Sequence, residues 1–144
     1  MEGEINTSNL TASINIWINN IHYSLLSKQP DTSSITQSSK KVSTSIISKD
    51  WPALYGQLSS EIQNTMTESQ FDDYMTSNTN KNIIAADLNE QGQINNLSGN
   101  TYYTKPITLT VQNTDGTTSI FHSNLFFAWE NDVWKLLSTD TPRE

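Results

Sequence analysis

Apolar and polar residues alternate most regularly in residues 101–139, near the C-terminal end of the chain. Three segments there are rich in β-branched and aromatic residues, which suit the pleated surface of a sheet. Two turn sequences separate them, Asn113-Thr114-Asp115-Gly116 and Glu130-Asn131-Asp132. An Asp-Gly pair between apolar runs favours a hairpin, because glycine reaches positive φ without a Cβ clash. The pattern therefore predicts three long antiparallel strands.

The length of the first turn decides which side chains share a face, because side chains alternate along a strand. We expect an even-length loop around Asp115 and Gly116, which pairs odd positions of one strand with even positions of the next. The face predicted to be the core then carries Tyr102, Thr104, Phe121, Leu125, Phe127, Trp129, Trp134 and Leu136. The second face carries Ile107, Leu109, Val111, Ile120, His122, Asn124, Phe126, Ala128, Val133 and Leu137. A three-residue loop would redistribute these sets.

The apolar second face needs a cover, because monomeric proteins rarely expose large apolar patches. One cover is a second copy of the domain across a twofold axis. The other is the segment 10–25, whose apolar residues recur at helical spacing. Residues 14–18 also alternate as a strand would, but the length of the segment favours a helix. The homodimer through the sheet face is the favoured cover, because the sequence after Pro30 reads as a flexible linker.

Helical periodicity precedes the strands. Helices are predicted at 34–48, 51–58 and 67–77. Asp50 can cap the second helix, and Pro52 suits its first turn. Thr67 and Gln70 have the spacing of a capping box, which would open the third helix.

Two shorter strands are predicted between the helices and the long strands. They cover residues 81–88 and 94–97, and the second is polar enough to lie at a sheet edge. Helices followed by a run of strands predict an α+β domain, with N-terminal helices packed on a curved antiparallel sheet. The predicted divisions are an N-terminal extension at 1–32, the domain at 33–140 and a tail at 141–144.

Two stretches carry a family resemblance. Residues 49–75, KDWPALYGQLSSEIQNTMTESQFDDYM, and residues 130–136, ENDVWKL, hold the motifs. The first resembles the helical half of nuclear transport factor 2-like domains, cone-shaped folds also called cystatin-like. The second is similar to their final hairpin, with Asp132 in place of the usual glycine. The resemblance covers residues 33–140 and is closest to domains of unknown function on bacterial lipoproteins and envelope proteins.

The composition of the chain excludes several classes of binding partner. The 144 residues carry a net charge of −7 and no cysteine, and only Lys40 and Lys41 form a basic cluster. Nucleic acid is therefore not an expected partner, and disulfides and cysteine-bound metals are excluded. No membrane span is expected, because polar residues interrupt the apolar N-terminal segment. The weakly charged composition, with 16% charged residues, indicates an extracytoplasmic location, in the bacterial envelope or secreted.

The sequence offers few candidate catalytic or ligand-binding residues. The resemblance implies that an enzyme of the ketosteroid isomerase type would hold a histidine or aspartate inside the cone as general base, and His122 and Asp87 are the candidates. The favoured interpretation of His122 is an ordinary sheet histidine. No metal-ligand spacing, phosphate loop or cofactor motif occurs. Aromatic side chains that could line a pocket, or simply fill the core, are Trp51, Tyr55, Tyr74, Phe127, Trp129 and Trp134.

These observations favour a non-catalytic function. The expected role is a module that binds a small hydrophobic ligand or a protein, or a spacer, in a cell-envelope protein. The alternative is a small-molecule isomerase or hydrolase that uses a histidine or aspartate in a pocket as general base.

Overall fold

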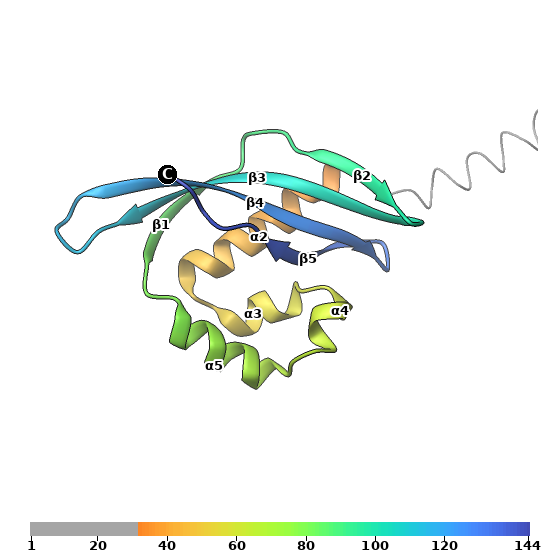
Figure 1. Ribbon diagram of the computed structural model, residues 1–144, viewed down its shortest axis with the longest axis horizontal. Coiled ribbons are helices and arrows are strands. Elements are labelled where there is room, and N and C mark those ends of the chain that lie inside the picture. The colour runs from red at the N-terminus through yellow and green to blue at the C-terminus, as the bar shows by residue number, and fades with distance from the viewer. Residues whose placement is uncertain (1–31) are drawn as a thin grey trace, which may run out of the picture. The chain divides into compact units, whose positions relative to one another are not determined.

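Helices come first along the chain and strands second in the computed structural model, which describes residues 32–144 (Figure 1). The helical elements are η1 (Thr32–Ser34), α2 (Ile35–Ser48), α3 (Trp51–Gly56), α4 (Ser60–Gln63) and α5 (Glu68–Asn78). The strands are β1 (Asn82–Asp87), β2 (Gln93–Leu97), β3 (Asn100–Gln112), β4 (Thr118–Glu130) and β5 (Val133–Thr139). The predicted α+β class is confirmed, and the short α4 was not predicted. The helix predicted at 10–25 lies outside the described residues.

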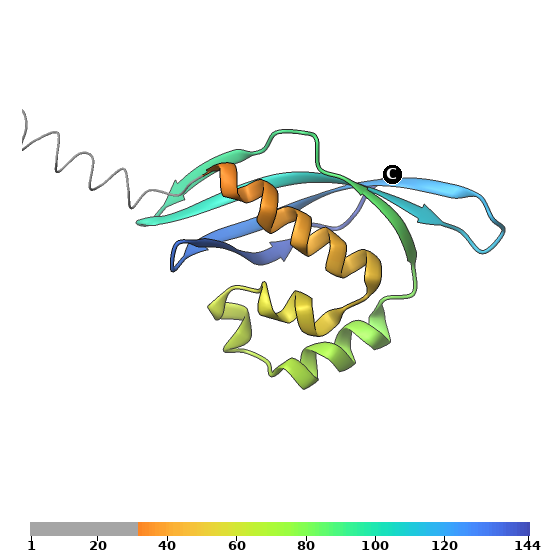
Figure 2. The same cartoon turned by 180° about the vertical axis from the view of Figure 1, so that it is seen from behind.

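The five strands form one antiparallel sheet. Its order is β1-β3-β4-β5, and β2 pairs with the N-terminal half of β3, beyond the part that β1 occupies. The sheet is strongly curled, and all the helices lie on its concave side (Figures 1 and 2). Bulges interrupt β1 between Ile83 and Ala85, and β5 opposite Phe126 and Phe127. Such irregularities bend and twist the strands that contain them.

The edge of β5 is joined to the segment between α3 and α4. The Leu136 amide donates to the Gln57 carbonyl at 2.8 Å, and the Ser59 amide donates to the Leu136 carbonyl at 2.8 Å. The end of β4 also holds the start of α4, because the Glu130 carboxylate accepts from the Ser60 amide at 3.0 Å. These bonds fix α3 and α4 at the rim of the curled sheet.

Local signals set the starts of α3 and α5 as predicted, although α3 ends at Gly56 and not at residue 58. The Asp50 side chain accepts from the Ala53 amide at 3.2 Å, and Pro52 lies in the first turn of α3. Thr67 and Gln70 form the reciprocal capping box at the start of α5, at 2.9 and 3.2 Å. These bonds satisfy amide groups that a helix start leaves without partners inside the helix.

Serines let α2 pack closely against the sheet. Ser39, Ser43 and Ser45 are buried, and each hydroxyl donates to a carbonyl one turn earlier in the helix. A buried hydroxyl without a partner would cost free energy, so these local bonds make the small side chains tolerable in the interior. The Ser-rich sequence therefore forms a packed helix.

The predicted pairing of β3 with β4 is wrong. Five residues, 113–117, separate the paired Gln112 and Thr118, so odd positions face odd positions, as in Leu109 opposite Phe121. Hydrogen bonds close this longer loop: the Asn113 amide donates to the Thr117 carbonyl at 2.7 Å, and the Asp115 carboxylate accepts from the Thr117 amide at 3.0 Å. Gly116 supplies the required positive φ of 88°.

The corrected register moves the apolar side chains of β3 into the core. Ile107, Leu109 and Val111 are buried on the concave face together with Leu125 and Phe127 of β4. The convex face instead receives the even positions of both strands, where Thr104, Thr108, Thr110, His122 and Asn124 separate the apolar Tyr102, Ile120 and Phe126. The apolar second face does not exist as predicted, and the reason for expecting a dimer on it is removed.

Two isoleucine variants test this register. Ile107 is 3% exposed and Ile120 is 45% exposed. We expect Ile107→Ala to lower the free energy of unfolding in urea by about 2–5 kcal/mol, because it leaves a cavity in the core. Ile120→Ala should lower it by no more than about 0.5–1 kcal/mol, as is usual for a surface change. Equal losses would contradict the odd-to-odd pairing.

Candidate functional site

A cavity of about 390 Å³ lies between the concave face of the sheet and the helices. This volume is within the range of small-molecule sites, roughly 300–1,000 Å³. Its apolar lining residues are Ile46, Trp51, Leu54, Leu58, Ile62, Phe71, Met75, Ile83, Ile107, Leu109, Leu125, Leu136, Leu137 and Pro142. Apolar walls of this kind favour an apolar ligand.

The cavity occupies only one end of the concave face. Towards the β4–β5 turn, aromatic rings fill the space: Trp134 contacts Trp129 edge-to-face with ring centroids 4.9 Å apart, and Tyr103 at 5.6 Å. Further along the same strands the inward residues are smaller, and Ile107 lies opposite Ser123. The change from aromatic to aliphatic and hydroxyl side chains leaves room for the cavity.

The opening of the cavity can be located from which of its lining residues are exposed to solvent. Trp51, Leu54 and Leu125 are each at most 5% exposed and form the inner wall. The end of β5 and the residues after it are exposed, at Ser138, Thr139 and Pro142, and Thr79 and Ile83 are half-buried. The rim therefore runs between the α5–β1 connection and the C-terminal end of β5.

The polar groups of the cavity are hydroxyls. They belong to Thr79, Ser123, Ser138 and Thr139, and no ionisable side chain is among the lining residues. The Ser123 hydroxyl already donates to Asp140, with its Oδ1 at 2.6 Å. The side-chain hydroxyls of Thr79, Ser138 and Thr139 form no hydrogen bond with the part of the protein that the structure describes. Ser138 lies opposite Phe126, a convex-face position, which leaves Thr79 and Thr139 on the inner side. These two hydroxyls remain able to bind a ligand.

Residues after β5 complete the wall. The Asp140 carboxylate accepts from the Asn124 amide at 2.7 Å and from the Asn124 side chain at 2.9 Å. The Arg143 amide donates to the His122 carbonyl at 2.8 Å, so the segment follows the edge of β4. Pro142 is thereby held at the rim. Hydrogen bonds from Ser123 and Asn124 keep the pKa of Asp140 below its ordinary value of 3.8.

The predicted pocket aromatics have different environments. Trp51 lines the cavity. Phe127 and Trp134 are fully buried in the core, and Trp129 packs against Trp134. The Tyr55 hydroxyl donates to the Met66 carbonyl at 2.7 Å. Tyr74 is 58% exposed on α5.

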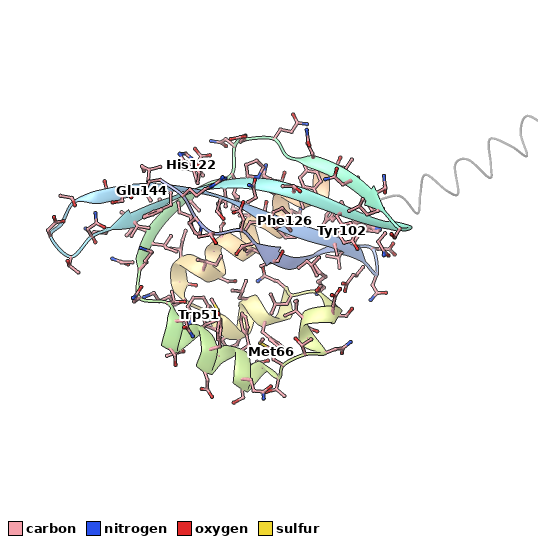
Figure 3. The ribbon with its side chains drawn as sticks, in the orientation of Figure 1. Trp51, Met66, Tyr102, His122, Phe126 and Glu144 are labelled. Atoms are coloured by element: carbon pink, nitrogen blue, oxygen red, sulfur yellow. The ribbon has the colours of Figure 1, made fainter. Side chains whose placement is uncertain are left out.

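The two candidate bases lie outside the cavity. His122 is exposed on the convex face, with Nδ1 3.3 Å from the Thr108 hydroxyl, whereas Trp51 lies among the helices (Figure 3). Asp87 is exposed at the end of β1 and accepts from the Asn89 amide at 2.8 Å, which closes a turn. Neither residue is among those lining the cavity. Among residues 32–144, no group of three His, Asp or Glu side chains is placed to hold a metal ion.

Sequence reasoning missed most of the cavity. Ile107 and Leu109 were placed on the opposite face because of the wrong register, although their alternation was visible. Thr139 and Pro142 lie at the rim because of the bulge in β5 and the bonds of Asp140, and we know of no sequence signal for either.

Comparison with protein-family models, with curated proteins and with solved structures found no match. Within residues 32–144, no helix has the length and apolar character needed to cross a bilayer.

Acid should weaken the attachment of the C-terminal segment. The folded state lowers the pKa of Asp140 below its ordinary value of 3.8. The ionised carboxylate therefore adds its full stability at pH values above that ordinary value, and this stability is lost as the pH falls through the lower pKa of the folded state. We expect Asp140→Asn to be less stable than the wild type at neutral pH, with the difference disappearing in acid. Urea unfolding at a series of pH values measures this difference.

Asp73→Asn is the matched control, because Asp73 is exposed on α5. Its effect should be smaller and should change little over the same pH range. A loss for Asp140→Asn that persists undiminished in strong acid would contradict a role for the ionised carboxylate.

Proposed function

We propose that this protein is a non-catalytic module that binds a small apolar molecule in the cavity under the curled sheet. The observation that carries the proposal is a cavity of about 390 Å³ whose lining is apolar except for hydroxyl groups. Burial of an apolar ligand gains roughly 25 cal/mol per Å² of surface removed from water. A general base needs a tuned ionisable group facing the substrate, and the lining supplies none.

The fold we propose is the nuclear transport factor 2-like cone. Support comes from the order of helices before a curled antiparallel sheet, and from the position of the motif residues. Trp51, Leu54 and Phe71, which match the family pattern, all line the cavity. These residues form the wall of the cavity, which is a role in shape and not in chemistry.

We place the module in a bacterial cell-envelope protein. The support is the resemblance to domains on lipoproteins, together with a chain that has no cysteine and only 16% charged residues. Binding a small apolar molecule suits such a location, because apolar molecules are found at and near membranes.

The isomerase or hydrolase alternative has less support. His122 and Asp87 are both exposed, and each already takes part in a local hydrogen bond. A base in either position would act at the surface, where water is not excluded.

An uncharged fluorescent probe tests the binding function. We expect 1-aminonaphthalene to show a saturable rise in fluorescence with the protein, because its fused rings are small enough to enter the apolar cavity. Ile83→Phe should weaken this binding several-fold, since Ile83 lines the rim and a larger side chain narrows it. Ile84→Phe is the matched control, because Ile84 is 44% exposed and lies outside the lining.

His122→Ala and Asp87→Ala should leave probe binding unchanged. Circular dichroism of all four variants shows whether they fold. Absence of saturable binding to the folded wild type, or equal losses in Ile83→Phe and Ile84→Phe, would contradict the cavity as the site.

A further inference from the structure

We propose that the natural ligand is a neutral amphiphile of about a dozen non-hydrogen atoms, with its apolar part inside and one uncharged hydrogen-bonding group at the rim. This inference rests on the proposed binding function and names the class of molecule that the same cavity would take. Three observations carry it: the volume, the absence of charge in the lining, and the position of the two available hydroxyls.

The volume of the cavity limits the size of the ligand. A water molecule takes about 30 Å³ of liquid, so a cavity of about 390 Å³ holds roughly thirteen atoms of that size with their hydrogens. A saturated chain of about ten carbons with one polar group, or a compact ring system of the same size, meets this limit.

The absence of charged side chains in the lining indicates that the ligand is uncharged. A charged group buried without a partner costs several kcal/mol, and no Lys, Arg, His, Asp or Glu side chain lines the cavity to compensate it. An anionic head group at the rim would also lie near Asp140, which directly follows the rim residue Thr139 and is ionised at neutral pH, and the positive charge of Arg143 already acts on Asp140. The net charge of −7 adds to this repulsion. A fatty acid anion is therefore a poor ligand.

The hydroxyls of Thr79 and Thr139 indicate how the ligand is oriented in the cavity. Thr139 lies opposite Leu125, a concave-face residue, because the bulge in β5 changes the alternation after Leu136. Thr79 faces the cavity from the end of α5. Ser123 lies deeper and is already bonded to Asp140. A ligand hydroxyl or carbonyl can thus bond at the rim, while its apolar body contacts Trp51 and Leu54.

Three molecules with the same chain and different head groups test the inference. Decanol, decanoate and decylammonium compete with 1-aminonaphthalene for the wild-type protein at neutral pH. We expect decanol to bind at least about tenfold more tightly than either ion. Decanoate would place its charge near that of Asp140, and decylammonium would find the Asp140 carboxylate outside the lining and already bonded to Ser123 and Asn124. Quenching or enhancement of Trp51 fluorescence provides a second measurement, and Trp51→Phe identifies its contribution.

Binding of decanoate or decylammonium as tight as that of decanol would overturn the inference. So would a failure of all three to displace a probe that does bind, and in that case the proposed binding function would still stand. A protein that binds neither the probe nor decanol would contradict the proposed function itself.

Paired threonine variants test the orientation. Thr→Val keeps the shape of the side chain and removes its hydroxyl. We expect Thr79→Val/Thr139→Val to weaken decanol binding about two- to tenfold, the usual value of one hydrogen bond, and to leave decane binding unchanged. Thr139→Ser, which keeps a hydroxyl, should bind decanol like the wild type. An unchanged ratio of decanol to decane affinity in the double variant would overturn the orientation.

Discussion

The pairing of β3 with β4 is the constraint on which the rest of the structure depends. These two strands form the centre of the sheet, and their register runs from Tyr102 opposite Ala128 to Gln112 opposite Thr118. Because side chains alternate, this single register decides that Ile107 and Leu109 face the helices. The same register gives the cavity its wall, and it gives the convex face threonine, histidine and asparagine side chains together with Ile120 and Phe126.

Features that depend on a few neighbouring residues could be predicted from the sequence. The capping bonds of Asp50 and Thr67 act within three residues, so the starts of α3 and α5 were expected. The register was not, because it depends on how Asn113 and Asp115 bond across their loop, and both an even and an odd loop fit the Asp-Gly pair. Alternation identified the apolar residues of β3 but could not tell which face they occupy.

The cavity could not be predicted because it depends on the difference between the shape of the sheet and that of the helices. Aromatic residues were expected to line a pocket, yet Phe127, Trp129 and Trp134 pack together and fill the end of the concave face where they lie. The open volume remains where the facing residues are Ile107 and Ser123. In this fold, smaller side chains make the site, and the large ones make the core beside it.

The backbone bonds between β5 and the α3–α4 segment have a consequence for how the chain behaves in a crowded solution. A strand at a sheet edge offers unpaired amides and carbonyls to any other strand that it meets. Leu136 has already used its amide and its carbonyl on Gln57 and Ser59, so this side of the sheet is occupied at its middle. At the opposite side, β1 contains a bulge and β2 is the short sequence QINNL. Bulges, short strands and polar residues all discourage edge-to-edge addition, so the sheet is protected from growing into aggregates at both of its sides.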